Sequence, residues 1–314
     1  MLDKLLNRYQ DLSDHITVTK KDPDVYPTFA QQYTDETVTN NSLVVECGDK
    51  SRYIPYTDIY KVDSSTYYTT GSVSQSFDGE GQITSAIDYV VSEDLPQVYL
   101  LSGHGEQPLS DNFRSQLTRS NYELTEDFSL LNVDSIPEEC DTLLINAPTG
   151  DISEEELSIL RDYLQSGGKL MVFSGPQKET ELTNLKTLLQ DYGVTAAEGV
   201  VVDNDREHYA FSAPYVLMPD IASSEITDPL TEGAYHVIVP IAQGLTVSGS
   251  QATALLTTSA ESFAKKAGYA MTTYEKEDDD TDGPYTLAVS VQNEADGKMV
   301  WVASDYLLED TYNS

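Results

Sequence analysis

The sequence contains few basic residues and few cysteines. Lysine and arginine together number 18 against 53 aspartates and glutamates, which gives a formal net charge of −35 at pH 7. Such a surface repels the phosphates of nucleic acids and of anionic lipid headgroups, so we exclude both as direct ligands. The two cysteines, Cys47 and Cys140, form neither a disulfide framework nor a zinc-binding pattern. We expect no cofactor.

Long apolar runs are also missing. No stretch approaches the roughly 20 apolar residues that a membrane-spanning helix requires, and no signal-peptide pattern precedes the first expected helix. Met1 nevertheless leads directly into an amphipathic helix, and the chain stops just after an expected strand that ends in Ser304-Asp305-Tyr306. We therefore expect both ends to have been cut from a longer protein that carries membrane segments.

The first third of the chain predicts a small α+β domain over residues 1–65. Gly48-Asp49-Lys50 forms the expected turn between two of its strands. The order α-β-α-β-β resembles half of a thioredoxin-like fold without the redox cysteines. Residues 63–80 lack periodicity, and 83–91 predict a helix, so we interpret 66–94 as a linker and helix. The expected elements of the small domain are helices over 2–12 and 26–33 and strands over 16–19, 42–47 and 52–56.

From residue 97 the pattern changes to alternating strands and helices. Ser153 and Glu156 form a capping box at the start of one helix. Apolar strands separated by helices indicate a parallel sheet with right-handed crossovers, so we predict a flavodoxin-like α/β domain over 95–314. The expected strands are 98–101, 142–146 and 169–173, the helices are 111–120, 153–165 and 180–192, and the apolar runs 200–202, 237–239, 286–291 and 299–303 are expected to extend the sheet.

Several motifs resemble the GldG family of auxiliary proteins of bacterial ABC transporters. The runs VYLLSGHGE and IPEECDTLLINAPTGDISEEELSILRDYLQSGGKLMVFSGP carry the resemblance, supported by SDHITVTKKDPDVYPTFAQQY, SAPYVLMPDI, PIAQGLTV and ALLTTS. The matching positions within the two longer runs are Gly103, His104, Gly105, Glu106, Pro148, Glu156, Leu160, Tyr163, Leu164, Gly167 and Gly168.

The resemblance implies a fold, a location and a set of partners. The fold is similar to that of class I glutamine-amidotransferase domains, with a flavodoxin-like sheet. Members of the family sit at the outer face of the bacterial cell membrane between transmembrane helices, beside a permease and an ATPase. We therefore expect an ABC permease and its ATPase as partners.

Residues 102–106 form the main candidate site. They follow the carboxyl end of a strand, where open α/β sheets place their ligand crevice, and His104 and Glu106 supply a titratable pair. The alternative is that the glycines shape a turn and Glu106 pairs locally. The candidate ligand-binding residues are Ser102, Gly103, His104, Gly105 and Glu106, together with Asn146, Pro148 and Ser174 at other strand ends.

The sequence does not predict an enzyme. A hydrolase or amidotransferase needs a nucleophile on a sharp strand-to-helix elbow, but no G-x-C-x-G or G-x-S-x-G occurs. Ser174 is the nearest candidate, and Cys140 stands at the wrong end of its strand. A cryptic hydrolase is therefore the weakest of the functional alternatives.

Two further groups of residues have competing interpretations. Asp278, Asp280 and Asp282 match the front of a calcium loop, but Val289 occupies the position of the bidentate glutamate, so a solvated acidic loop is the better interpretation. Tyrosines near the expected linker suggest a docking or sugar-stacking face, or simply half-buried strand positions; they are Tyr53, Tyr56, Tyr60, Tyr67 and Tyr68.

We therefore predict a non-catalytic auxiliary subunit that binds partners outside the membrane. The alternative is a module that binds a glycan or a small polar ligand in the crevice at His104 and Glu106. The two hypotheses differ in whether a partner-sized surface or a defined pocket is present.

Overall fold

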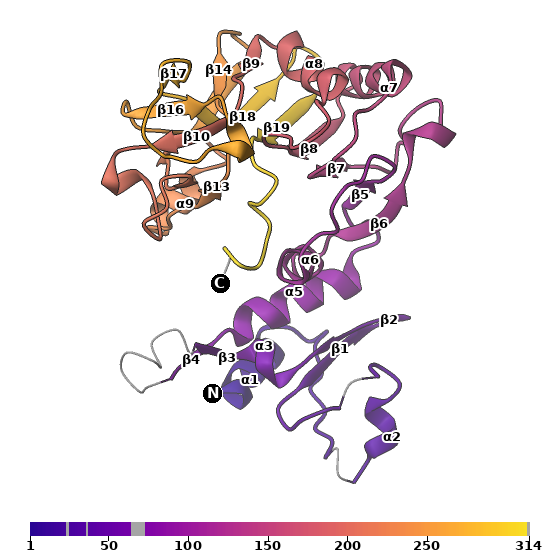
Figure 1. Cartoon of the computed structure of the whole chain (residues 1–314). Coiled ribbons are helices and arrows are strands. Elements are labelled where there is room, and N and C mark those ends of the chain that lie inside the picture. Colours follow the sequence, from indigo (N-terminus) through magenta and orange to yellow (C-terminus); the bar gives the residue numbers. More distant parts are fainter. Residues whose placement is uncertain (23–24, 36, 64–72, 313–314) are drawn as a thin grey trace. The chain divides into compact units, whose positions relative to one another are not determined.

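The computed structural model describes residues 1–22, 25–35, 37–63 and 73–312. The chain divides into two compact units (Figure 1). The first comprises Met1–Leu95 with Leu117–Tyr122, and the second comprises Pro96–Gln116 with Glu123–Ser314. Among the described residues, no helix has both the length and the apolar character needed to cross a membrane.

The first unit consists of two antiparallel strand pairs and a few helices. Strand β1 pairs with β2, and β3 pairs with β4, each in its own two-stranded sheet. Ile54, Ile59 and Ile83 form much of its small core. Its elements are α1 (Leu2–Leu12), α2 (Pro27–Ala30), β1 (Leu43–Cys47), β2 (Lys50–Ile54), α3 (Tyr56–Ile59), β3 (Tyr60–Asp63), β4 (Ser74–Phe77) and α5 (Gly79–Val91).

Several expectations for this region need correction. Residues 16–19 form no strand, and the helix expected over 26–33 is limited to Pro27–Ala30, so the order α-β-α-β-β is not reproduced. Strand β4 lies within the stretch interpreted as a loop, and α5 belongs to the first unit. Tyr67, Tyr68 and the expected boundary after residue 65 lie outside the described residues.

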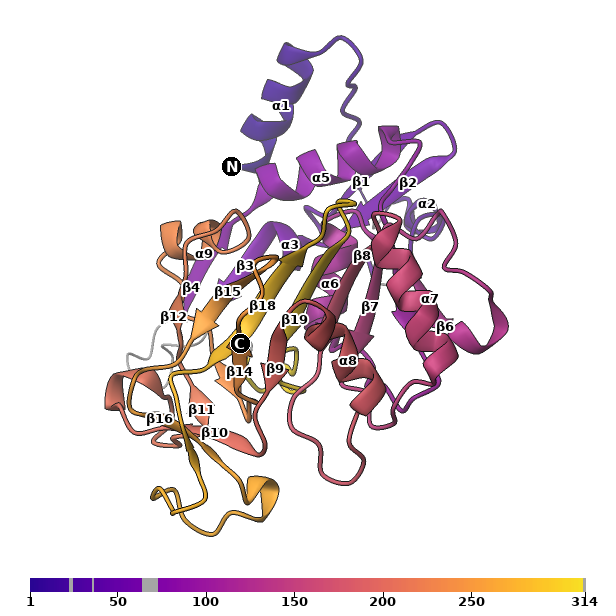
Figure 2. The ribbon, with the colours of Figure 1, turned by 90° about the horizontal axis from the view of Figure 1, so that it is seen from above.

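The second unit is built on a mixed sheet whose centre is parallel. Strands β6, β5, β7, β8 and β19 lie side by side in that order and run parallel, which is the flavodoxin-like arrangement. Helices α7 and α8 lie along one face of this sheet (Figure 2). The elements of this part are β5 (Gln97–Leu101), α6 (Asp111–Arg119), β6 (Glu123–Phe128), β7 (Thr142–Asn146), α7 (Glu154–Gln165), β8 (Lys169–Phe173), α8 (Thr183–Asp191) and β19 (Lys298–Val302).

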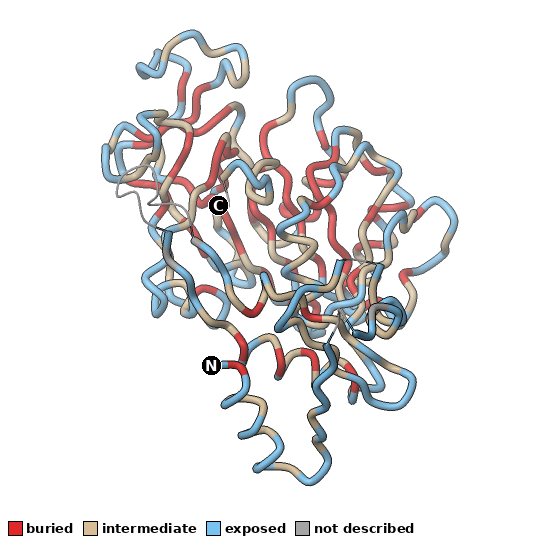
Figure 3. Tube along the Cα trace, turned by 90° about the horizontal axis from the view of Figure 1, so that it is seen from below, coloured by how far each residue is buried: buried red, intermediate tan, exposed pale blue. Residues whose placement is uncertain are grey.

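Antiparallel strands extend the sheet beyond β19. Strand β18 pairs with β19 and β15, β12 follows β15, and β14 joins β18 to β9. The buried residues gather in these strands and in the helices against them (Figure 3). The remaining elements are β9 (Val194–Ala196), β10 (Val200–Asp203), β11 (Val216–Leu217), β12 (Asp220–Ile221), α9 (Asp228–Glu232), β13 (Val239–Pro240), β14 (Leu245–Val247), β15 (Ala252–Thr257), β16 (Ser262–Lys265), β17 (Thr281–Asp282) and β18 (Thr286–Gln292).

The apolar runs late in the chain do not all extend the central sheet. The runs 286–291 and 299–303 do so as β18 and β19, the first of them antiparallel. The run 200–202 instead forms β10, which pairs with β16 in a separate three-stranded sheet, and the run 237–239 contributes only Val239 to the small β11–β13 pair. An apolar run specifies burial but not the partner strand, so the sequence could not distinguish these sheets.

Candidate functional site

The candidate segment 102–106 follows β5, the strand at which the order of the parallel sheet reverses. The chain passes from β5 to β6 on one side and later places β7 on the other. Ligands of open α/β sheets bind outside the carboxyl ends of the two strands that flank such a reversal. The structure therefore places this segment at the expected position for a site.

His104 lies between two glutamates. Its Nδ1 is 3.1 Å from Oε1 of Glu106. Its Nε2 is hydrogen-bonded to Oε2 of Glu156 at 3.2 Å and lies 3.1 Å from Oε1 of the same carboxylate. The side chains of His104, Glu106 and Glu156 are only 8%, 6% and 4% exposed. The backbone N–H of His104 also donates to Oε2 of Glu106 at 2.8 Å. These contacts join the end of β5 to the first turn of α7.

The charges of this triad reinforce one another. The hydrogen bond to Glu106 raises the pKa of His104, against the opposing effect of burial, and Glu156 raises it further. Burial alone would raise the pKa of both glutamates, but hydrogen bonds from His104 and from the backbone lower each of them below the ordinary value. The two carboxylates therefore favour the protonated form of the ring, and the protonated ring favours the ionised form of both carboxyl groups.

Glu156 has a second role at the start of α7. Its Oε2 accepts the N–H of Ser153 at 2.8 Å, and its own N–H donates to Oγ of Ser153 at 3.2 Å. This is the capping box that the sequence predicts, and it is confirmed. One carboxylate thus serves both the helix cap and His104.

The crevice at the strand reversal is filled by the chain itself. The carbonyl oxygen of His104 accepts the N–H groups of Thr149 and Gly150 at 3.0 and 2.7 Å. Gly105 has φ +73°, and a Cβ there would lie 2.1 Å from Oγ1 of Thr149. Only glycine fits this close approach in that backbone conformation. The segments 102–106 and 147–150 therefore interlock.

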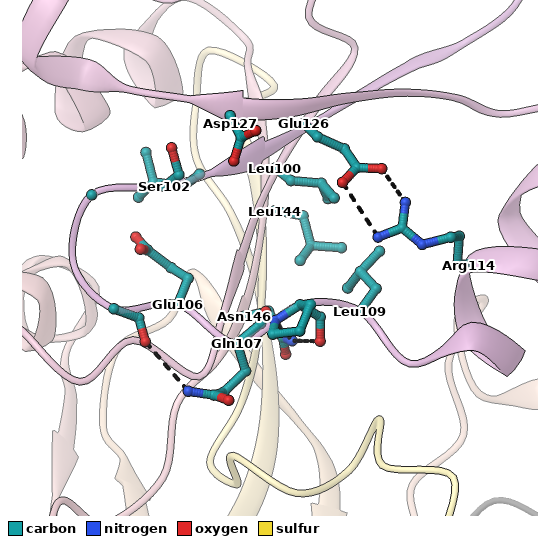
Figure 4. Close-up of a pocket in the computed structure, with 14 residues that line it drawn as sticks. Leu100, Ser102, Glu106, Gln107, Leu109, Arg114, Glu126, Asp127, Leu144 and Asn146 are labelled. Atoms are coloured by element: carbon teal, nitrogen blue, oxygen red, sulfur yellow. Dashed lines mark hydrogen bonds and ion pairs between the residues drawn. The ribbon is translucent and has the colours of Figure 1, made fainter.

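A pocket lies beside these two interlocked segments, which we call the plug, on the side of β6. Its volume is about 270 Å³, and Figure 4 shows its polar residues around Leu100 and Leu144. Five of the predicted ligand-binding residues line it: Ser102, Gly103, Gly105, Glu106 and Asn146. The sequence interpretation did not include the remaining lining residues, Leu100, Leu101, Gln107, Pro108, Leu109, Arg114, Glu126, Asp127 and Leu144.

The amide of Asn146 is oriented by the chain that follows Glu106. Its Nδ2 donates to the carbonyl oxygens of Gln107 and Pro108 at 2.9 and 3.3 Å, which fixes which end of the amide is the oxygen. Asn146 is 7% exposed, and its Oδ1 accepts no hydrogen bond from the described residues. An acceptor buried without a donor costs about 1–3 kcal/mol, so a donor from outside the chain would be stabilised here.

Three of the predicted residues do not line this pocket. The ring of His104 contacts Glu156, and Pro148 is buried in the interlocked segment. Ser174 follows β8 and is 1% exposed; its carbonyl oxygen accepts the indole N–H of Trp301 at 3.1 Å, and its Oγ has no partner among the described residues. The predicted set is therefore split between the pocket, the plug and the next strand end.

Two of the pocket residues that the sequence missed, Glu126 and Asp127, come from β6. That strand reads Glu-Leu-Thr-Glu-Asp-Phe and lies at the edge of the sheet, where charged residues are common. Arg114 of α6 pairs with Glu126, and Asp127 follows with φ +57°. The available signal was the spacing between the helix over 111–120 and the next predicted strand, which leaves room for another strand.

The acidic loop is occupied by internal contacts. The Nζ of Lys265, which is fully buried, lies 3.0 Å from Oδ2 of Asp280, and Asp280 also accepts the N–H groups of Lys266 and Glu277 at 2.9 Å. Asp282 pairs with Lys276. Among the described residues, no three histidine, cysteine, aspartate or glutamate side chains are placed to hold a metal ion.

A larger hollow of about 960 Å³ lies between the segment after β8, α8 and residues 195–199 and 266–270. Two lysines on its walls are already paired: Lys186 lies 3.0 Å from Glu181, and Lys266 lies 3.5 Å from Glu198. The Nζ of Lys178 lies 4.8 Å from the centroid of the Tyr269 ring. This hollow therefore presents mostly compensated charge.

Comparison with known proteins identifies a family and a fold. The model of the family described as "ABC-type uncharacterized transport system" matches residues 95–313. No curated protein matches the sequence. Among solved structures, the "mmIFT52 N-terminal domain" is similar with a TM-score of 0.51 and 18% identity over 69% of this chain and 89% of that one. At this identity the likeness shows the fold alone.

Two other solved structures are more distant. A putative ThuA-like protein from Bacteroides uniformis has a TM-score of 0.36 and 12% identity, covering 71% of this chain and 88% of that one. A glutamine amidotransferase from Thermotoga maritima has a TM-score of 0.38 and 9% identity, covering 67% of this chain and 76% of that one.

Proposed function

We propose, since the chain belongs to the family described as "ABC-type uncharacterized transport system", that it acts by binding partner proteins and not by catalysis. Family membership makes the chain an auxiliary component of an ABC-type transport system.

The state of His104 carries the proposal. Both ring nitrogens face carboxylates at 3.1 Å, and the ring is almost completely buried. A general base must offer a free lone pair to a proton of the substrate, and both ring nitrogens of His104 are already held by buried carboxylates. This geometry supports an ionic bridge that holds β5 against α7.

The possible nucleophiles give the same indication. Ser174 is buried, and the groups within hydrogen-bonding distance of its backbone are Val302 and Trp301. Burial raises the pKa of the Cys140 thiol, whose Sγ lies 3.8 Å from the hydroxyl oxygen of Tyr163. A thiol with a raised pKa is a poor nucleophile. In the described part of the chain, no base is hydrogen-bonded to the side chain of either residue, as acyl transfer would require.

The finer assignment rests on the GldG-like motifs. In this proposal the chain is the domain of a GldG-type protein at the outer face of the bacterial cell membrane, held there by membrane segments outside this sequence. Its partners are the permease and, through the permease, the ATPase. The net charge of −35 supports protein partners with basic surfaces over nucleic acid or anionic lipid.

The test is a cross-linked pull-down of the membrane-anchored protein from its native cells, with the partners identified by mass spectrometry. Recovery of a permease and its ATPase supports the proposal. If neither subunit is recovered with the unmodified protein, the auxiliary-subunit proposal is rejected.

A second candidate function has one observation in its favour. Asn146, whose buried Oδ1 has no partner among the described residues, lines a defined pocket, as expected for a module that binds a glycan or another small polar ligand. A glycan screen on the purified chain distinguishes the two functions. Binding that is lost in a variant of the pocket, together with a pull-down that recovers no transporter subunit, would favour the ligand-binding module.

A further inference from the structure

The pocket beside β5 and β6 is rich in hydrogen-bond acceptors. Asn146 lines it with a side chain whose buried Oδ1 has no donor among the described residues. Ser102 donates its hydroxyl to the carbonyl oxygen of Phe128 at 3.3 Å, which leaves the Ser102 oxygen able to accept. Asp127 contributes a carboxylate at the rim. Figure 4 shows Ser102 and Asp127 on one side of the pocket and Asn146 on the other.

The charge of the pocket is uncompensated at one residue. The carboxylate of Glu106 is paired with His104, and that of Glu126 is paired with Arg114. No ion pair of Asp127 occurs in the part of the chain that the structure describes, and its carboxylate is exposed. The pocket therefore retains one negative charge in a chain whose net charge is −35.

Apart from the acceptors and Arg114, whose guanidinium is paired with Glu126, much of the lining is apolar. Leu100, Leu101, Leu109 and Leu144 line the pocket together with Pro108. Leu101, Leu109 and Leu144 are 4%, 5% and 2% exposed, so they are fixed by the core behind them. The fitting occupant must therefore combine an aliphatic stem with a cationic head that donates hydrogen bonds in more than one direction.

We propose that this pocket receives an arginine side chain of a partner subunit of the transport system. The guanidinium is planar, permanently charged and carries five N–H donors, so it can meet acceptors on both sides of the pocket at once. It is also less strongly hydrated than the lysine ammonium, which lowers the cost of burying it among leucines. Its three methylene groups pack against the leucines.

The negative net charge of this chain favours a basic partner protein as the source of the arginine. An acidic surface attracts a basic partner over long range, and a single buried arginine then fixes the register of the contact. The pocket volume of about 270 Å³ suits one side chain more than a larger ligand. This inference rests on the proposed function, because it identifies how the auxiliary subunit recognises a partner.

The first test uses the purified chain and does not depend on a partner. Methyl NMR of Leu100, Leu109 and Leu144 reports directly on the pocket. Nα-acetyl-arginine N-methylamide is titrated against the citrulline analogue, which has nearly the same shape but no charge. We expect saturable shifts with arginine and at least about tenfold weaker binding for citrulline, because a charge-assisted hydrogen bond is lost.

Asp127→Asn is the decisive variant. Asparagine tolerates the positive φ of Asp127, so the fold is preserved while the charge is removed. We expect about tenfold weaker binding of the arginine probe, whereas Asp134→Asn, at an exposed position outside the pocket, leaves it unchanged. Equal binding of arginine and citrulline, or an unchanged affinity in Asp127→Asn, overturns the proposal.

The second test separates a partner side chain from a free ligand. Asp127→Arg and the control Asp134→Arg are compared in the cross-linked pull-down from native cells. Loss of the transporter subunits only with Asp127→Arg supports the proposal. Recovery that is equal in both variants overturns the partner as the occupant, even where the probe binds. If the unmodified protein recovers no subunit, the proposed function fails, and the NMR titration still decides whether the pocket binds a guanidinium.

Discussion

The Nε2 of His104 is hydrogen-bonded at 3.2 Å to Oε2 of Glu156, a residue 52 positions further along the chain. This contact links the turn after β5 to the amino-terminal cap of α7, the helix that follows the neighbouring strand β7. Glu106 holds the other ring nitrogen and also lines the pocket. We call the ionic contacts among His104, Glu106 and Glu156 the tie.

Replacement of His104 should destabilise the second unit strongly. His104→Gln leaves two buried glutamates without their shared cation, and removal of one member of a buried ionic network typically costs about 3–5 kcal/mol. Chemical denaturation of the purified chain measures this loss. His236→Gln, at an exposed position in the same unit, is the control and should change the free energy of unfolding by less than about 0.5 kcal/mol. Equal effects of the two variants would contradict the tie.

The stabilisation of the folded protein by these three residues should be confined to a defined pH range. The raised pKa of His104 means that its contribution is complete below the ordinary value of 6.5 and is lost as the pH rises through the higher folded-state value. The lowered pKa values of Glu106 and Glu156 mean that their contribution is complete above 4.5 and is lost as the pH falls through the folded-state values.

The difference in unfolding free energy between the unmodified chain and His104→Gln measures this range directly. It should be largest between about pH 5 and 6.5 and should decrease on both sides. A difference that stayed constant from pH 5 to 9 would mean that the ring is neutral in the folded protein, and the imidazolium assignment would have to be abandoned.

Gly105 should tolerate no side chain. Gly105→Ala forces a residue with a Cβ into φ +73° and places that atom 2.1 Å from Oγ1 of Thr149. The positive φ alone costs about 1–2 kcal/mol, and the clash adds to it. Gly48 has φ +60° with nothing within 4 Å, so Gly48→Ala isolates the backbone cost. Thermal unfolding should show the larger loss for Gly105→Ala, and Thr149→Ala should recover part of it; no recovery would argue against the close approach.

These residues show where sequence reasoning succeeds. The capping box could be predicted because Ser153 and Glu156 are only three positions apart and the pattern has one geometric solution. The central strands could be predicted because each is a short apolar run buried on both faces, as in the residues of β7. Both signals are local in the chain.

The tie and the pocket depend on contacts that are not local. Glu156 was predicted as a cap, but nothing in the sequence indicates that the same carboxylate reaches His104. Likewise, Asp127 belongs to an edge strand that has no apolar run, so an analysis of apolar runs does not find it. The close approach of Gly105 to Thr149 is likewise a contact between distant parts of the chain, which spacing along the sequence cannot supply.

Asp305 provides the last prediction. Its Oδ1 accepts the N–H of Gly175 at 2.8 Å, but burial raises the pKa of its carboxyl group to about 6, against the opposing effect of that hydrogen bond. A raised folded-state pKa means that the native protein binds this proton more tightly than the unfolded chain does. Stability therefore decreases as the pH rises from 3.8 through about 6, because the carboxylate becomes charged where it is poorly solvated.

Asp305→Asn keeps an acceptor for Gly175 but carries no charge at any pH. We expect the variant to gain stability relative to the unmodified chain by up to about 2–3 kcal/mol between pH 4 and pH 8, from a shift of about two pKa units at 1.36 kcal/mol each. Urea denaturation at the two pH values measures the gain, with Asp279→Asn at an exposed position as the control. A variant that gained nothing at pH 8 would show that Asp305 ionises in the folded protein as readily as an exposed aspartate does.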